Sequence, residues 1–212
     1  MLPPLGQGHS PPTTHQAVAT LRKQHVSQTR AALLVAGRML FGSKGFAGAS
    51  VEDLANEAGV TTGALYHHFE NKTELFAAVF EQVHLEVLAR NGEAAARAKN
   101  EVGSLVLAFS DFLDAVLDAE VRQIMITDAP SVLGLQRFTE LDERYAFVAV
   151  VDTLKRAAAS GELAVRNPEA LAHLLLGALV RGAVLIANST TPTKTSKAVS
   201  ATINDLLVGL AP

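Results

Sequence analysis

The stretch SVEDLANEAGVTTGALYHHF, residues 50–69, decides the fold of this chain. Its first half repeats apolar residues at the i, i+3, i+4, i+7 spacing of one helix face, at Val51, Leu54, Ala55 and Ala58. Ser50 followed by Asp53 resembles a capping box, and Gly59 permits a sharp turn. Only Gly59 and Val60 separate a helix over 50–58 from a second one over 61–69. This spacing predicts a helix-turn-helix.

The segments on both sides of this motif are also predicted to be helical. A first helix over about 27–41 ends at Gly42 and Gly45, and another starts after Asn71 and runs to Arg90, before an Asn91-Gly92 break. Beyond it, apolar residues recur at three- and four-residue steps, which predicts helices over 101–117, 120–128, 138–160, 168–188 and 193–210. Loops are expected at Ala129-Pro130, Gly161 and Pro192. The predicted fold class is all-α.

Composition limits the kind of protein this is. The chain has 212 residues, enough to bury a sizeable core, and no cysteine, which fits a reducing cytoplasm and excludes disulfides and thiolate metal sites. Residues 1–12 are rich in Pro, Gly and Ser and lack the basic start and apolar run of an export signal, and we expect 1–24 to be a disordered tail. The stretch 170–187 is apolar, but it contains His173 and Arg181, which favours a buried bundle helix over a membrane span.

Charge is distributed unevenly along the chain. The net charge is −3, yet residues 1–50 contain no Asp or Glu and carry five basic residues: Arg22, Lys23, Arg30, Arg38 and Lys44. Any contact with DNA therefore belongs at the N-terminal end. Arg22, Lys23 and His25 precede the first predicted helix, and they form a basic arm that we expect to add minor-groove or phosphate contacts.

The second helix of the motif has the side chains that DNA recognition needs. Leu65 and Phe69 lie four residues apart and are expected to pack inward, which leaves other faces for DNA. Small residues over 61–64 allow the first turn of this helix to approach base edges. Hydroxyl and imidazole groups at Thr62, Tyr66 and His67 can bond to bases or phosphates.

Each of these residues also has a purely structural interpretation. A Tyr or His on a helix is commonly a half-buried residue at the edge of a core. Lys72 in the first turn of the next helix is either a phosphate anchor or a solvated lysine. The combination of residues, more than any one member, favours DNA.

Together these residues carry a family resemblance. The pattern Phe41-Gly42-x-x-Gly45-Phe46, Ser50-Val51-x-x-Leu54-Ala55-x-x-Ala58-Gly59-Val60, Gly63-x-Leu65-Tyr66-x-His68-Phe69-x-x-Lys72-x-x-Leu75 resembles the DNA-binding domain of tetracycline-repressor (TetR) family regulators. It covers about a fifth of the chain. The resemblance implies DNA contacts from Ser50, Thr61, Thr62, Gly63, Tyr66, His67 and Lys72, with Lys44 as a further candidate.

The resemblance also implies an organisation and a mechanism. A tail over 1–24 would precede a DNA-binding domain over 25–72 and a helical ligand-binding and dimerisation domain over 73–212. The protein would bind a palindromic operator as a homodimer and be released by a small-molecule effector. No cofactor, metal or membrane partner is implied.

The C-terminal half allows weaker expectations. The family's last two helices usually form the dimer, which implies contacts from Leu171, Leu174, Leu175, Ala178, Leu185, Leu206 and Leu207, although these residues also suit an intramolecular core. Candidate ligand contacts are polar residues within apolar helical runs: Arg122, Asp128, Tyr145, His173 and Arg181. A surface position or an internal salt bridge explains the charged ones equally well.

Two other classes of function remain alternatives. An enzyme is disfavoured because the sequence has no phosphate-cradling glycine loop, no zinc-binding His-Glu-x-x-His spacing and no nucleophile elbow. A helical adaptor that binds protein through its N-terminal helices would bind without the salt dependence that phosphate contacts produce.

Overall fold

The computed structural model describes residues 14–211, with the side chains of 25–134, 136–141 and 144–211. All regular structure in this part of the chain is helical, which confirms the all-α prediction. The elements are α1 Thr14–Gly48, α2 Val51–Glu57, α3 Thr62–His68, α4 Lys72–Ala95, α5 Glu101–Ala115, α6 Ala119–Val121, η1 Arg122–Asp128, α7 Ala129–Asp142, η2 Glu143–Phe147, α8 Val148–Ala159, α9 Pro168–Ala187 and α10 Pro192–Val208. The two η elements are π-helical turns.

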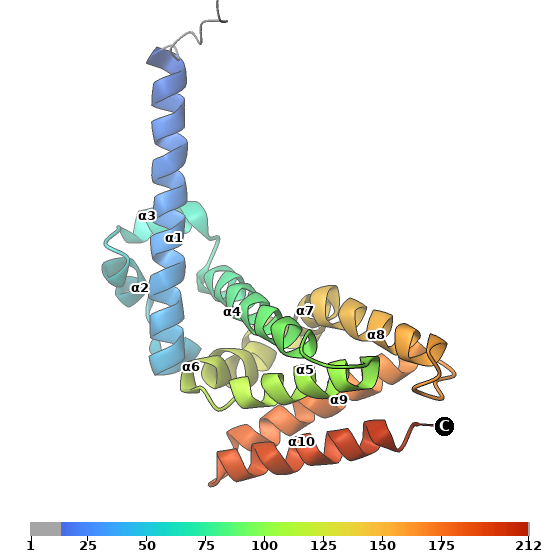
Figure 1. Cartoon of the computed structure of the whole chain (residues 1–212). Coiled ribbons are helices and arrows are strands. Elements are labelled where there is room, and N and C mark those ends of the chain that lie inside the picture. The colour runs from blue at the N-terminus through green and yellow to red at the C-terminus, as the bar shows by residue number, and fades with distance from the viewer. Residues whose placement is uncertain (1–13, 212) are drawn as a thin grey trace, which may run out of the picture.

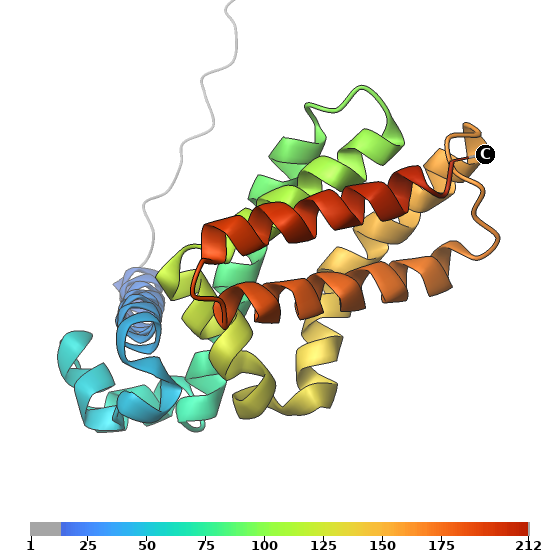
Figure 2. The same cartoon turned by 90° about the horizontal axis from the view of Figure 1, so that it is seen from below.

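The helices are arranged in two parts, as predicted. Helices α1, α2 and α3 form the helix-turn-helix part at one end, and α4 leads from it into a bundle that contains α5, α8, α9 and α10 (Figure 1). In the second view α9 and α10 run side by side along the bundle (Figure 2). The N-terminal part of α1 projects beyond α2 and α3 (Figure 1).

The first helix is longer than predicted. It begins at Thr14, so residues 14–24, expected to be a disordered tail, are helical, while residues 1–13 lie outside the described part. The segment 16–24 is composed largely of Ala, Leu, Arg, Lys and Gln, which have high helix propensity, and this explains the difference. At its other end the predicted glycine break is at Gly45, whose φ of 72° and ψ of 168° interrupt the helix.

Two predicted breaks are absent. Helix α4 continues through Asn91-Gly92 to Ala95, because its C-terminal half is held by packing of Val87 and Ala94, which are 3% and 2% exposed. The expected loop at Ala129-Pro130 is also wrong, since η1 continues directly into α7 and the chain breaks later, at Gly134 with φ of 75°. The π-helical turn η1, which is wider than an α-helical turn, lies just before Pro130. Proline has no backbone N–H to donate to a regular helix at this point.

The core consists of two clusters, and the first joins the two parts of the molecule. Phe41, Phe46 and Phe76 form an aromatic group with ring centroids 5.2–5.8 Å apart. The same cluster contains Val121, Ile124 and Met125 from the α6–η1 region of the C-terminal part. The second cluster fills the bundle of α5, α8, α9 and α10 around fully buried residues such as Leu113, Leu154 and Ile186.

Polar contacts reinforce this junction. The backbone N–H of Phe46 donates to Asp128 Oδ2 at 2.7 Å, and Arg38 donates to Glu120 Oε1 at 2.7 Å. Arg137 on α7 makes two hydrogen bonds to the Glu74 carboxylate on α4 and lowers the pKa of Glu74. The N-terminal part is therefore attached to the C-terminal part through both packing and hydrogen bonds.

Helix α9 is the one described helix that is long and apolar enough to span a membrane by length and composition. Here it packs against α5, α8, α10 and η1 within the bundle. Packing within the bundle therefore explains the apolar composition of α9.

Candidate nucleic-acid interface and ligand cavity

The helix-turn-helix is fixed by local hydrogen bonds. Ser50 Oγ accepts from the Asp53 N–H at 3.0 Å and the Asp53 carboxylate accepts from the Ser50 N–H, which completes the predicted capping box. Thr61 Oγ1 accepts from the Ala64 N–H at 3.1 Å at the start of α3. Gly59 has φ of 67°, a left-handed conformation that glycine adopts at little cost. The turn residue and both caps therefore set the orientation of α3.

Helix α3 presents one face to solvent and one to the core. Leu65 is fully buried and Phe69 is 5% exposed, and both belong to the core cluster that holds the helix against the rest of the domain. The side chain of Tyr66 is 54% exposed. The predicted DNA-contact positions on and before this helix are all exposed: Thr61, Thr62, Gly63, Tyr66 and His67. The structure thus brings these five together on one open surface.

Lys44 and Ser50 lie close by, next to α2. Lys44 Nζ is 3.7 Å from Asp53 Oδ2, and both residues are exposed enough for this ion pair to exchange with a phosphate. Ser50 already uses its hydroxyl oxygen as an acceptor in the cap, and its hydroxyl proton is the group that suits a phosphate oxygen.

Lys72 has a structural role that its sequence position did not reveal. Its ammonium group donates to the carbonyl oxygens of Phe46 and Ala49, at 2.9 and 3.0 Å, and lies 4.1 Å from the centroid of the Phe46 ring. These contacts hold the segment between α1 and α2 against the start of α4. The ammonium group is directed into the domain.

Replacing Lys72 with methionine is expected to lower the free energy of unfolding by about 1–3 kcal/mol, because two charge-assisted hydrogen bonds are lost and two carbonyls lose their partner. Urea denaturation followed by circular dichroism measures this change. The matched control is Lys99→Met at an exposed position beyond α4, which should leave stability unchanged. Unchanged stability in Lys72→Met together with weaker DNA binding would instead identify Lys72 as a phosphate contact.

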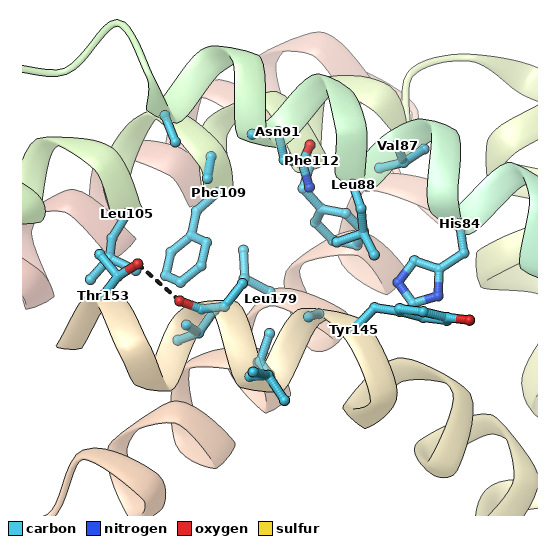
Figure 3. A pocket seen from close by; sticks show the side chains of 18 of the residues that line it. His84, Val87, Leu88, Asn91, Leu105, Phe109, Phe112, Tyr145, Thr153 and Leu179 are labelled. Atoms are coloured by element: carbon cyan, nitrogen blue, oxygen red, sulfur yellow. Dashed lines mark hydrogen bonds between the residues drawn. The ribbon is translucent and has the colours of Figure 1, made fainter. Parts of the chain in front are cut away.

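A cavity of about 620 Å³ lies in the C-terminal part, a size typical of small-molecule sites. Its walls come from α4, α5, the η2–α8 segment and α9. Phe109, Phe112, Leu88, Leu105 and Leu179 surround its centre, and His84 and Tyr145 lie together at one end (Figure 3). The cavity is predominantly apolar.

A hydrogen bond and an ion pair with Glu81 connect the polar end of the cavity to α4. The Tyr145 hydroxyl donates to Glu81 Oε1 at 2.8 Å, and Arg144 Nη1 lies 3.6 Å from the same oxygen. Burial lowers the pKa of His84 to about 4, so its imidazole is neutral at pH 7. The side chain of Arg144 is 58% exposed, which places this charge at the rim.

Two family models match the sequence. The model for bacterial regulatory proteins of the tetR family matches residues 33–79, and the model for the tetracyclin repressor-like C-terminal domain matches residues 102–210, just over half of the chain. The chain belongs to the TetR family. It is a transcriptional regulator with a DNA-binding helix-turn-helix.

Known TetR-family proteins are similar over most of the chain. The regulator TtgR of Pseudomonas putida is 29% identical over 183 residues, covering 79% of this chain and 85% of that protein. A TetR-family regulator of Pectobacterium atrosepticum is 30% identical with a TM-score of 0.78, covering 89% of this chain and 96% of that one. FadR of Bacillus subtilis, solved in complex with stearoyl-CoA, shares the fold with a TM-score of 0.71 at 17% identity, covering 84% of this chain and 97% of that one.

In this TetR-family chain, the five predicted ligand contacts lie in different places. Tyr145 lines the cavity. Arg122 donates to the Val116 and Leu117 carbonyls at the end of α5, and Asp128 accepts from the Phe46 N–H. The remaining two lie on α9, where His173 stacks on the Phe147 ring with centroids 4.3 Å apart and Arg181 borders a groove beside α10.

Sequence reasoning missed most of the lining of this cavity. His84, Asn91 and Thr153 border it from α4 and α8, Ser104 and Arg144 add polar groups from α5 and η2, and most of the rest of the wall is aliphatic or aromatic. Apolar residues in amphipathic helices give no signal that distinguishes a cavity wall from a filled core. A histidine on the apolar face of α4 was the single available signal.

Helices α9 and α10 of this TetR-family chain also carry an exposed apolar face. Leu174, Leu185 and Leu206 are 72%, 48% and 56% exposed, and Ala178 is exposed between them. Leu175 and Leu207 are buried, and Leu171 packs at the edge of the bundle core. The buried members therefore belong to the intramolecular core, and the dimer contacts stay a prediction for the exposed members. A groove between α9 and α10 runs along the exposed face.

Proposed function

We propose that this regulator binds a palindromic operator as a homodimer and is released by a small molecule that enters the cavity. The observation that carries the proposal is the open face of α3, which Leu65 and Phe69 hold rigidly against the domain. A rigid, exposed helix face with small residues at its start suits insertion into a major groove.

The DNA contacts follow from this placement. Thr62 and Gly63 in the first turn of α3 meet base edges, and the hydroxyl of Tyr66 and the imidazole of His67 bond to phosphates or bases. Lys44 near the end of α1, and Ser50 and Thr61 at the starts of α2 and α3, contribute to the flanking phosphate contacts. Lys72 contributes indirectly, because its ammonium group holds the α1–α2 segment in place.

The homodimer is proposed to form through the exposed face of α9 and α10. Contiguous exposed apolar residues on a soluble domain commonly mark an interface between proteins. A two-fold dimer would place the two α3 helices one DNA turn apart, about 34–36 Å, to match a palindrome. An operator lies in the cytoplasm, which is where we place this protein.

Release is proposed to act through α4. This helix supplies the wall of the cavity from His84 to Ala95, and its first residue follows α3 after only three residues. A ligand that fits better when α4 is displaced would shift the population toward dimers with altered spacing of the α3 helices, and so lower operator affinity. FadR, which shares this fold, was solved in complex with stearoyl-CoA, and this supports a small-molecule site in the C-terminal part.

The operator proposal is tested with duplexes selected from a random pool and measured by fluorescence anisotropy at several salt concentrations. We expect affinity to fall steeply with salt, and Tyr66→Ala to weaken binding at least about tenfold, since a good contact is worth about 1–3 kcal/mol. The control is Leu107→Ala, an exposed apolar position on α5 that should leave binding unchanged. Salt-independent binding, or no selected duplex, would count against DNA recognition.

The release proposal is tested separately. Compounds that raise the melting temperature of the protein are titrated into the protein–operator complex, and a cavity ligand is expected to lower operator affinity at least about fivefold, the scale of typical coupling energies. A cavity ligand that leaves operator affinity unchanged would overturn ligand-relieved repression and leave DNA binding intact.

A further inference from the structure

The chemical character of the cavity wall restricts what it can bind. Most of the lining is aliphatic or aromatic, and its charged side chain, Arg144, lies at the rim beside Glu81. The Arg144 side chain is 58% exposed, so its charge stays solvated at the rim and is not buried against an ion inside the cavity. Burying an ionised group without a partner costs several kcal/mol.

The hydroxyl and amide groups of the wall have already used their protons, and the buried imidazole of His84 is neutral. Ser104 donates to the Ala95 carbonyl at 3.2 Å, Thr153 to the Ala149 carbonyl at 2.9 Å and Tyr145 to Glu81 at 2.8 Å. The Asn91 amide, in the orientation its neighbours require, donates to the Val87 carbonyl and to Asp111.

A hydroxyl whose proton is committed can still accept a hydrogen bond through its lone pairs. The wall therefore offers acceptors from Ser104 and Tyr145 to a ligand that enters the cavity, whereas Thr153 Oγ1 already accepts from Arg156 at 3.0 Å. An anion needs donors, whereas a neutral molecule with a hydroxyl or N–H group can supply the donor itself.

We infer that the cavity takes an uncharged, predominantly apolar molecule that carries a hydrogen-bond donor, and that it rejects anions of the same size. This inference names the ligand class of the effector site and rests on the proposed function. The inferred ligand class of this chain differs from that of a regulator that binds an acyl-CoA, because the head group of an acyl-CoA is anionic.

Two dyes with one skeleton test the charge selection. N-phenyl-1-naphthylamine is neutral and has an N–H donor, and 8-anilino-1-naphthalenesulfonate is the same molecule with an added sulfonate. We expect the neutral dye to bind the full-length protein at least tenfold more tightly, as measured by its fluorescence increase. Equal or tighter binding of the sulfonate would overturn the inference.

Tyrosine emission locates the bound dye. The chain has two tyrosines and no tryptophan, so in Tyr66→Phe the remaining tyrosine is Tyr145 in the cavity wall. Binding of the neutral dye should quench this emission. Dye binding without quenching would place the dye elsewhere and contradict the inference.

Filling the cavity supplies the matched variants. Ala108→Phe projects a ring into the cavity and should weaken binding of the neutral dye at least tenfold, while Ala159→Phe, at an exposed position on α8 outside the lining, should not. If the melting curve shows that Ala108→Phe is unfolded, Ala149→Phe on the exposed side of the lining replaces it. Unchanged dye binding in a folded cavity-filled variant would overturn the assignment.

No DNA is present in these assays, so failure here leaves the operator test unaffected.

Discussion

Replacing Gly63 with glutamate is expected to weaken operator binding at least about 100-fold and to leave the fold intact. A Cβ at position 63 has Thr61 Oγ1, at 3.8 Å, as its nearest neighbour, so the protein has room for the side chain. The new carboxylate would lie where α3 approaches the groove, and it would oppose phosphates on both half-sites of a palindrome. About 2.7 kcal/mol corresponds to the 100-fold change.

Anisotropy with the selected duplex measures this loss, and thermal melting by circular dichroism shows that the fold is retained. Ala159→Glu makes the same change in charge at an exposed position on α8 and should reduce affinity only slightly, through long-range repulsion. Retained operator affinity in folded Gly63→Glu would show that the start of α3 does not enter the groove.

Replacing Phe76 with alanine is expected to produce the largest loss of stability, about 3–5 kcal/mol, as for other fully buried phenylalanines. Phe76 is fully buried on α4 and contacts the rings of Phe41 and Phe46 edge to face. The substitution would leave a cavity in the cluster that joins α1, α4 and η1.

Urea denaturation provides the measurement, and Val35→Ala provides the control because Val35 is 71% exposed on α1. The control should change the free energy of unfolding by less than about 0.5 kcal/mol. A loss below about 1 kcal/mol in Phe76→Ala would show that the cluster rearranges to fill the space, and that the two parts are joined less tightly than the packing indicates.

The helix-turn-helix was predictable because its determinants are local. The Ser50 capping box, the Gly59 turn and the inward-facing pair Leu65 and Phe69 each act within a few residues of sequence, and all agree with the structure. The predicted breaks at Asn91-Gly92 and Ala129-Pro130 failed because tertiary packing overrode local preferences there.

The cavity could not be predicted for the opposite reason. Its wall combines residues from four helical segments up to 96 positions apart, from His84 to Val180, and nothing local to any segment marks it as a wall. Lys72 shows the same limit, because its partners Phe46 and Ala49 lie 26 and 23 residues earlier in the sequence. Of the polar residues chosen on composition, Tyr145 alone lies at the cavity.

The shared aromatic cluster has a consequence for protein engineering. A hybrid sensor made by cutting such a chain at Lys72, between the two parts, and joining each half to another protein would separate Phe41 and Phe46 from Ile124 and Met125. The hybrid would then have mismatched apolar surfaces at the junction, where the original chain has one continuous core cluster. Functional exchange of sensing modules in this protein therefore requires that residues from the α6–η1 region be transplanted together with α1 to α3.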